Sequence, residues 1–413
     1  MNDLIQCSKE RLQDKLKTFA TFGATEGGGV TRLSLSKEAL AARDEFCWRM
    51  KECGAEILTD DLGDIYARFA GTDDSLPAIM SGSHLDSVRQ GGNYDGTLGV
   101  LCAMEAAETI ARQKIPHRHP ITVTVWTNEE GARYVPAMMC SGIITGKFNK
   151  DEMLASIAKD VDELTFGDAL EKSGFIGSEK NRISAENCTA LVELHIEQGP
   201  VLESRQKEIG VVEHVVGSVT YDFVFRGQAD HAGTFPMPYR KDAFLAAAKA
   251  LLYLHEECDK LDKELVYTTG KISAHPNIYT IIPDEVHFSF DARHKDPAVL
   301  EQVMDIIKNM PKEFANCSAE AVYGWSRDTV KFDPQLIDTV QETVDALGYS
   351  NMRMGSGAGH DAQYLSELVP TTMIFVPSEG GHSHCELEHT SLDACWKGAN
   401  VLVNTLLKID AIK

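Results

Sequence analysis

The chain has 413 residues, of which 43% are hydrophobic and 25% are charged, so it is long enough for two or more globular domains. Its net charge of −22 argues against nucleic acid and against an anionic membrane as partners, because both would repel so acidic a surface. The ten cysteines form no CxxC pair, the first residues lack the apolar core of a signal peptide, and no apolar run has the length of a membrane span, so we expect a cytoplasmic protein with free thiols.

The first third of the chain alternates between helical and strand-like patterns. Apolar residues spaced at 3.6 predict helices, whereas alternation and β-branched runs predict strands. The predicted helices cover residues 1–20, 36–53 and 98–112, and the predicted strands cover residues 55–58, 64–69, 77–80 and 121–127. Alternation of this kind is typical of an α/β sheet.

A second, smaller domain is predicted within the chain, with element order β-α-β-β-α-β, which is the ferredoxin-like order. Its strands are predicted at 211–226, 265–272, 285–293 and 319–329, and its helices at 241–261 and 297–310. We place this inserted α+β domain at residues 213–330. Residues 1–212 and 331–413 then form the main α/β domain, with helices on both faces of its sheet.

Polar side chains follow several predicted strands of the main domain. His84 and Asp86 come after the strand at 77–80, where ligands bind in open α/β sheets. Asp86 can face the same way as His84, which suits a carboxylate that holds the second nitrogen of a metal-bound imidazole. Asp95 precedes the helix at 98–112, so a helix N-cap is an equally good interpretation of this residue alone.

Three further strands end in the same manner. Glu129 and Glu130 follow the strand at 121–127, where one glutamate could bind a metal and the other could face the water it activates. The alternative for this pair is an exposed acidic turn, because glutamate is mostly exposed in proteins. His195 ends an apolar strand, where a hydrogen-bonded core histidine is the alternative, and His384 follows the strand predicted at 371–376.

This mixture of imidazoles and carboxylates suits zinc, manganese or cobalt-type ions better than calcium. Two imidazoles and one carboxylate would serve one ion, and one imidazole and two carboxylates would serve another, provided that one aspartate is shared. Two such ions, about 3.5–4 Å apart, stabilise an attacking hydroxide and a developing oxyanion together. A remaining glutamate beside them would be the general base.

Taken together, the motifs resemble those of the two-metal aminoacylase/carboxypeptidase family over essentially the whole chain. The motifs are GSHLD at 82–86, GGNYDG at 91–96, NEEG at 128–131 and LHIEQG at 194–199. Two more, HAGTFPM at 231–237 and SGAGHDA at 356–362, are similar to those of its ureidase branch, which contains N-carbamoyl-L-amino acid hydrolases, allantoate amidohydrolases and yeast-type β-ureidopropionases. The resemblance implies a zinc-exopeptidase-like main domain and an inserted lid and dimerisation domain.

The resemblance also implies which residues hold two divalent ions in each subunit. His84, Asp95 and His195 would hold one ion, and Asp95, Glu130 and His384 would hold the other. Zinc or manganese is expected, with cobalt or nickel as alternatives. The presence of all five ligands argues against a non-enzymatic binding protein, because carboxylates gathered without a metal repel one another.

Roles in catalysis and substrate binding follow from the same resemblance. Glu129 would be the base that deprotonates the bridging water and later protonates the leaving nitrogen, and Asp86 would orient His84. The residues expected to line the substrate site in the main domain are Gln198, Gly359 and His360.

The inserted domain is expected to contribute His231 and Arg293 and to form a homodimer in which these residues reach the partner's site. His231 would polarise the carbonyl, and Arg293 would bind the substrate carboxylate, to which its planar fork is suited. The alternative for Arg293 is a surface residue paired with Asp291 or Asp296. Thr280 stands where the branch usually has an asparagine that helps to bind the carboxylate, and Asn277 is a candidate to compensate.

The expected reaction is metal-dependent hydrolysis of a linear amide C–N bond in a small carboxylate-bearing substrate. An N-carbamoyl-L-amino acid would give the amino acid, carbon dioxide and ammonia. Allantoate and other N-substituted amino acids are the alternatives, because the Thr280 departure leaves the substrate less defined than the reaction.

Overall fold

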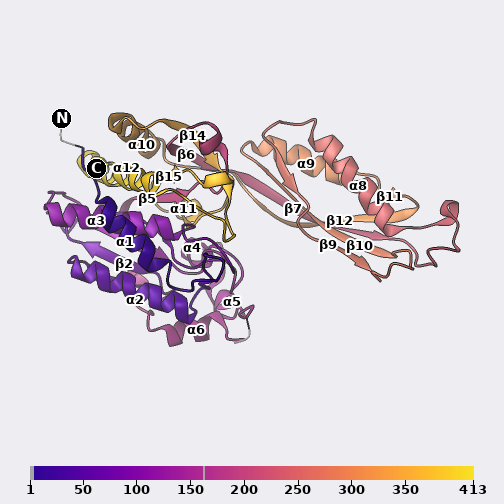
Figure 1. Ribbon diagram of the computed structural model, residues 1–413, viewed down its shortest axis with the longest axis horizontal. Helices are drawn as coiled ribbons and strands as arrows, with labels where there is room; N and C mark the ends of the chain where they lie inside the picture. Colours follow the sequence, from indigo (N-terminus) through magenta and orange to yellow (C-terminus); the bar gives the residue numbers. More distant parts are fainter. Residues whose placement is uncertain (1–3, 161–162) are drawn as a thin grey trace. The chain divides into compact units, whose positions relative to one another are not determined.

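The computed structural model describes residues 4–160 and 163–413, which divide into two compact units. The first comprises Met1–Glu213 and Phe332–Lys413, and the second comprises His214–Lys331. Each border lies one residue from the position drawn on sequence. Figure 1 shows the path of the chain by colour, with the second unit formed by the middle of the sequence.

The first unit is built on the larger of two sheets, a 9-stranded sheet with order β1-β2-β4-β3-β5-β15-β6-β13, in which β14 pairs with β6. Its strands are β1 (Glu56–Thr59), β2 (Ile65–Phe69), β3 (Ala78–His84), β4 (Ile121–Trp126), β5 (Cys188–Ile196), β6 (Ile209–Val215), β13 (Val330–Lys331), β14 (Asn351–Ser356) and β15 (Thr371–Val376). Strands β3, β4, β5 and β15 pair in parallel. Their carboxyl ends therefore meet at one edge, where ligands bind in such sheets.

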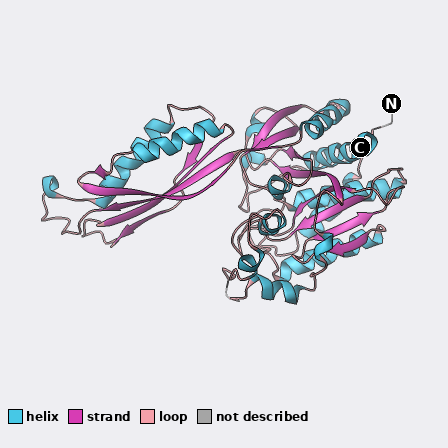
Figure 2. Ribbon diagram, turned by 180° about the vertical axis from the view of Figure 1, so that it is seen from behind, coloured by secondary structure: helices cyan, strands magenta, loops and turns pink. Residues whose placement is uncertain are grey.

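Helices cover both faces of this sheet, as Figure 2 shows from behind. They are α1 (Lys9–Phe19), α2 (Lys37–Glu52), α3 (Thr97–Gln113), α4 (Met139–Ile144), α5 (Lys150–Leu154), α6 (Phe166–Ser173), α7 (Val201–Ser204), α10 (Pro334–Leu347), α11 (Asp361–Leu365) and α12 (Leu392–Ile412). Leu191 of β5 packs in one buried cluster with Leu365 of α11. Leu194 points to the opposite face, where it contacts α12 beside Gly398.

Strand β3 is longer than the sequence suggested, and this changes the setting of His84. The small residues after Met80 were expected to end the strand, yet it continues to His84, paired with β4 along its length. The small residues are needed because the neighbouring strand is so near: a Cβ on Gly82 would lie 2.0 Å from the Thr124 carbonyl oxygen. His84 is therefore the last residue of the strand rather than part of the loop that follows.

Other boundaries differ where local signals are weak. The helix predicted over 1–20 begins at Lys9, after the Ser8 side chain accepts a hydrogen bond from the Arg11 amide as an N-cap. Residues 1–3 lie outside the described part of the chain. The short helices α4, α5 and α6 and strand β14 were not predicted, because each is too short to show a period.

The second unit is a 6-stranded antiparallel sheet with order β11-β12-β7-β10-β8, in which β9 pairs with β10. Its elements are β7 (Gly217–Arg226), α8 (Ala243–Cys258), β8 (Val266–Thr268), β9 (Ile272–His275), β10 (Glu285–His294), α9 (Pro297–Asn309), β11 (Glu313–Phe314) and β12 (Cys317–Arg327). Every second residue of β10 is buried, and Phe223 stacks on Phe288 with ring centroids 4.9 Å apart. The predicted strands at 211–226 and 265–272 each prove to be two shorter strands.

A buried charge cluster joins α1 to α3. Lys15 is 2% exposed, and its Nζ lies 2.7 Å from carboxylate oxygens of both Glu105 and Glu108. Lys15→Met should lower the free energy of unfolding by about 3 kcal/mol, because it removes the buried ammonium and leaves Glu105 and Glu108 to the more exposed guanidinium groups of Arg11 and Arg112. Urea unfolding would measure this. Lys9→Met is the control, since its exposed ion pair with Asp393 is expected to contribute under about 1 kcal/mol.

Within residues 4–160 and 163–413, no helix combines the length and the apolarity needed to cross a bilayer.

Candidate active site

Two groups of side chains that could hold a metal ion share a residue at the carboxyl edge of the parallel strands, where Glu193, His195 and His360 form a further such group. One contains His84, Asp95 and His195, and the other contains Asp95, Glu130 and His384. Within each group the candidate ligand atoms all lie within 4.8 Å of one another. These are the two sets that the resemblance implied, and Asp95 belongs to both.

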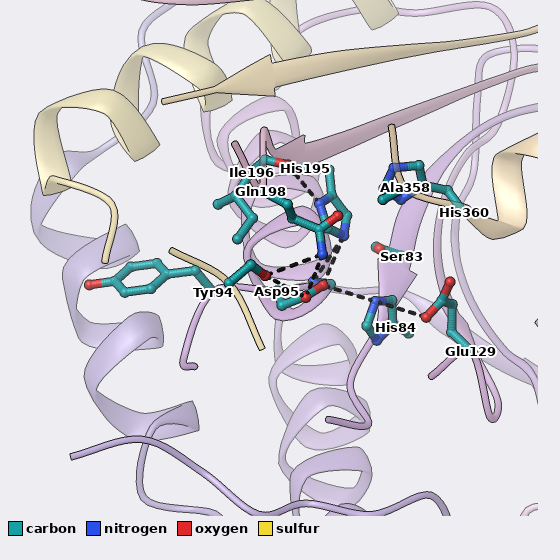
Figure 3. Close-up of polar contacts among 12 residues, drawn as sticks. Ser83, His84, Tyr94, Asp95, Glu129, His195, Ile196, Gln198, Ala358 and His360 are labelled. Carbon is teal, nitrogen blue, oxygen red and sulfur yellow. Dashed lines mark hydrogen bonds and ion pairs between the residues drawn. The ribbon is translucent and has the colours of Figure 1, made fainter. Parts of the chain in front are cut away.

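Asp95 lies between three imidazoles, as Figure 3 shows in part. Its Oδ1 is 3.2 Å from Nε2 of His195 and 3.5 Å from Nε2 of His84, and its Oδ2 is 3.2 Å from Nε2 of His384. The N-cap of α3 is Gly96, which makes no side-chain capping bond. The N-cap interpretation of Asp95 is therefore wrong, and its carboxylate faces the histidines instead.

The backbone fixes the tautomers of the two buried histidines. Nδ1 of His84 lies 2.9 Å from the Asp86 carbonyl oxygen, and Nδ1 of His195 lies 2.9 Å from the Ile196 carbonyl oxygen. Carbonyl oxygens only accept, so each Nδ1 carries the proton that is donated. Each Nε2 then faces Asp95, and that of His195 also accepts a hydrogen bond from the Gly96 amide at 3.2 Å. An Nδ1 that donates to oxygen while Nε2 is left for a cation is the arrangement that metal-ligating histidines adopt.

Asp86 positions the site differently from the sequence expectation, in which its carboxylate would hold His84. Its Oδ1 is 3.8 Å from Nδ1 of His84, which is too long for a hydrogen bond, and its backbone carbonyl accepts that proton instead. The carboxylate oxygens face the amides of Glu129 and Glu130, at 3.4 and 3.3 Å. The side chain of Asp86 therefore holds the turn that carries the two glutamates.

Glu129 points into the site and is only 8% exposed, so the exposed acidic turn is excluded for this residue. Its Oε2 lies 3.6 Å from Nε2 of His84. The turn depends on Asn128, which has a φ of 59° and whose side-chain amide donates to the Tyr134 carbonyl. This places adjacent glutamate side chains in two directions, with Glu130 beside His384 and Glu129 beside His84.

Burial and mutual repulsion dominate the electrostatics of the site. Burial raises the pKa of Glu129 well above its usual value; His84 opposes the rise and Glu130 adds to it. Burial, together with the charge of Asp95, raises the pKa of Glu130 to about 8. Carboxylates held this closely without cations must retain protons.

The donor set fits two divalent ions of the zinc or manganese type. Imidazole nitrogens and carboxylate oxygens are their usual ligands. Within the described residues, Oε1 of Glu130 is buried without a hydrogen-bond partner, and so is Oε1 of Gln198. Such acceptors are costly to bury unless something binds them, and cations beside them would do so.

The remaining residues predicted in the first unit lie around this cluster. Nε2 of Gln198 donates to Oδ2 of Asp95 at 2.8 Å, so this side chain contacts a ligand directly. The ring of His360 lies 4.6 Å from that of His195, and its Nε2 is 2.9 Å from the Ser356 hydroxyl. Gly359 precedes His360 in the loop between β14 and α11. Figure 3 shows Gln198 in contact with Asp95, and His360 on a separate segment of the chain.

His231, Arg293 and Asn277 belong to the second unit, and their roles in substrate binding stay predictions. Nδ1 of exposed His231 accepts hydrogen bonds from the amides of Gly233 and Thr234, so its Nε2 carries a proton that it can donate. Arg293 is half-exposed, with its Nε 2.8 Å from Oδ1 of Asp291, as its alternative interpretation foresaw. Asn277 is exposed with a φ of 58°.

Gly96 is a site residue that sequence reasoning did not single out. Its φ is 60°, and a Cβ built on it would lie 2.3 Å from ring atoms of His84. Gly96→Ala should displace the imidazole and weaken metal binding by about 10-fold or more, since ligand orientation sets affinity. Zinc titration of the purified variant would measure this. Gly54→Ala is the control, because its φ of 95° is also positive but a Cβ there would meet no atom within 4 Å.

Comparison with known proteins places this site among characterised relatives. The model of peptidase family M20/M25/M40 matches residues 80–408. An N-carbamoyl-L-amino-acid amidohydrolase of Rhizobium meliloti is 38% identical to this chain, and the match covers 97% of this chain and 96% of the relative. An allantoate amidohydrolase of Bacillus subtilis (strain 168) is 35% identical, and the match covers 97% of this chain and 98% of the relative. The crystal structure of a hydantoinase/carbamoylase family amidase from Burkholderia multivorans has a TM-score of 0.89 and 37% identity, covering 98% of both chains.

Proposed function

The chain belongs to peptidase family M20/M25/M40, and from this premise we propose that it hydrolyses N-carbamoyl-L-amino acids to the amino acid, carbon dioxide and ammonia. It is a hydrolase of linear amide C–N bonds other than peptide bonds, as its amidohydrolase relatives are. The observation that carries the proposal is the pair of ligand groups sharing Asp95, with the free carboxylate of Glu129 beside them.

Two divalent ions would be held by the five ligands, one by His84, Asp95 and His195 and one by Asp95, Glu130 and His384. When bound, they would lower the pKa of water and offset negative charge on the carbonyl oxygen. We propose zinc or manganese, with cobalt or nickel as alternatives, because the imidazole-rich donor set suits these ions.

Glu129 would move the proton. Its carboxylate accepts a proton from the water that adds to the carbamoyl carbon, and then gives this proton to the nitrogen that leaves when the C–N bond breaks. A buried carboxylate surrounded by like charges is suited to this double task, because its pKa is raised towards the working pH. Asp86 would hold the turn in place through the Glu129 and Glu130 amides.

Substrate binding would involve both units. Gln198, Gly359 and His360 would line the site in the first unit. From the second unit, Arg293 would bind the substrate carboxylate with its guanidinium fork, with Asn277 as an auxiliary group, and His231 would support the oxyanion. Arg293 would have to exchange its contact with Asp291 for the substrate.

We also propose a cytoplasmic homodimer formed through the second unit, whose residues reach the partner's active site. Among the described residues, strand β12 lies near the edge of its sheet, and its partner on the outer side is the two-residue β11. Farther along β12, Val322, Tyr323 and Trp325 are 45%, 53% and 51% exposed. An exposed apolar strand edge of this kind favours association.

Allantoate is the second candidate substrate. Thr280 in place of the branch's usual asparagine favours keeping it, because a hydroxyl cannot match both hydrogen bonds of an amide. Allantoate amidohydrolases of Bacillus subtilis and Escherichia coli are also 35% and 33% identical to this chain.

A substrate panel tests the proposal. Metal-reconstituted protein would be offered N-carbamoyl-L-amino acids, allantoate and N-acetyl amino acids, and ammonia or free amino acid would be measured. Ammonia release from a carbamoyl amino acid is expected, with Glu129→Gln as the inactive control. Release from allantoate alone would select the second candidate, and cleavage of acetyl compounds alone would overturn both ureido substrates.

A further inference from the structure

We propose that Glu388 and Ser383 are positioning residues for Asp95, acting together to hold the carboxylate that the two ion sites share. Neither residue is among the five ligands, and neither was singled out in the sequence. The inference rests on the metal site of the proposed function and adds two residues that hold the Asp95 carboxylate in the position in which it binds both ions.

Glu388 fixes the backbone on which Asp95 stands. Its side chain is 4% exposed, and its Oε1 accepts the amide protons of Tyr94 and Asp95 at 2.9 and 3.0 Å. The approach is possible only because Gly92 has no side chain, since a Cβ there would lie 2.0 Å from the same oxygen. A single carboxylate oxygen thus holds the residues immediately before α3.

Ser383 connects the other oxygen of Glu388 to the Asp95 carboxylate. Its hydroxyl lies 3.0 Å from Oε2 of Glu388 and 3.1 Å from Oδ2 of Asp95. Nε2 of Gln198 donates to the Ser383 hydroxyl oxygen at 3.2 Å and to Oδ2 of Asp95 at 2.8 Å. These four groups form one closed network around the shared ligand.

The hydroxyl of Ser383 has one proton and two carboxylates that can accept it. When it donates to Asp95, it occupies the oxygen that lies toward His384. When it donates to Glu388, that oxygen of Asp95 keeps the hydrogen bond from Gln198 and has a lone pair left for a cation, while the hydroxyl remains satisfied. Glu388 therefore gives the proton a second position, and metal binding can proceed without leaving a buried donor unpaired.

The charge of Glu388 fits the same role. Within the described residues no basic side chain lies within 4.0 Å of its carboxylate, although the group is buried next to Asp95. A buried carboxylate without a basic partner is costly. Cations bound by Asp95 would offset this cost together with His384, whose charge already interacts with Glu388.

Zinc titration of metal-free protein by calorimetry tests the proposal. Glu388→Gln keeps the shape and one oxygen for the two amides, but its NH₂ group cannot accept the Ser383 proton. We expect it to bind zinc about 10–100-fold more weakly, the usual effect of losing a partner of a metal ligand. Ser383→Ala should weaken zinc binding by a similar factor. The loss of zinc affinity in the double variant should be smaller than the product of the two single losses, because both residues act through Asp95.

Glu386→Gln is the matched control, because Glu386 lies in the same loop and accepts a hydrogen bond from Thr25 rather than contacting Asp95. It should bind zinc like the wild type. The metal-free variants should all keep one cooperative thermal transition, which separates positioning from a general loss of loop structure. Wild-type zinc affinity in both Glu388→Gln and Ser383→Ala would overturn the proposal, as would an equal loss in Glu386→Gln. If the wild type binds two ions yet cleaves no ureido substrate, the proposed function fails while this inference stands.

Discussion

Replacing Glu129 with glutamine is expected to lower kcat by about 10²–10⁴-fold while the fold and the bound metal are retained. Glutamine has the same shape but can neither take a proton from water nor carry one to the leaving nitrogen. Glu129 belongs to neither ligand group, so the five ligands should still bind two ions. Steady-state rates on the best ureido substrate, with metal content measured on the same samples, would check this.

Glu130→Gln provides the contrast, because Glu130 belongs to the group with Asp95 and His384. It should lose activity together with part of its metal, whereas Glu129→Gln should lose activity alone. A Glu129→Gln enzyme with two ions and a near-normal rate would show that another group moves the proton. Restoration of activity in Glu130→Gln by excess metal would strengthen the division of roles between adjacent glutamates.

The gathering of several candidate ligands at one edge could be predicted from the sequence, because apolar strands followed by polar side chains are recognisable even where their exact ends are not. His84, Glu130 and His195 each follow or end an apolar strand, and parallel pairing of β3, β4 and β5 brings those ends to one edge. Asp95 could not be assigned from local pattern alone, since an aspartate before a helix is equally typical of an N-cap. The structure resolves that alternative through Gly96, which takes the cap position.

The supporting contacts could not be predicted, because they depend on how closely loops approach one another. Glu388 contacts Tyr94 and Asp95 across 294 and 293 residues of chain, and nothing in its own segment indicates this. The glycine pair before Asn93 was the one available signal, since a missing Cβ at Gly92 marks a close approach. Asp86 shows the same limit: the residue was identified, but which of its groups meets His84 depends on where β3 ends.

Removal of the metals is expected to abolish turnover and also to destabilise the protein, by an amount that grows between pH 6 and pH 9. A metal ion at a free concentration about 1,000 times its dissociation constant contributes roughly 4 kcal/mol to the free energy of unfolding. Without them, the fold must accommodate Asp95, Glu129 and Glu130 in one buried space, where protons take the place of the cations.

The direction of the pH dependence follows from the raised pKa values of the site, among them those of Glu130 and His384. Burial and Asp95 raise the pKa of Glu130 from 4.5 to about 8, and the hydrogen bond to Asp95 raises that of half-exposed His384 from 6.5 to about 9. The metal-free folded state therefore holds protons that the unfolded chain has released. That stability is complete below the unfolded pKa values and is lost as the pH rises through 8 and 9. The metal-loaded protein has ligands that are already deprotonated, so its stability should change less.

Thermal midpoints of chelated and zinc-loaded protein at pH 6, 7, 8 and 9 would measure the difference. The difference in thermal midpoint between the two forms should widen with pH. Glu130→Gln should reduce the pH slope of the chelated form, because it removes one of the titrating groups. A chelated protein that became more stable with rising pH would mean that the carboxylates do not hold protons when the metal is absent. The gathering of His384, Glu130 and Asp95 would then need another explanation than a site built for cations.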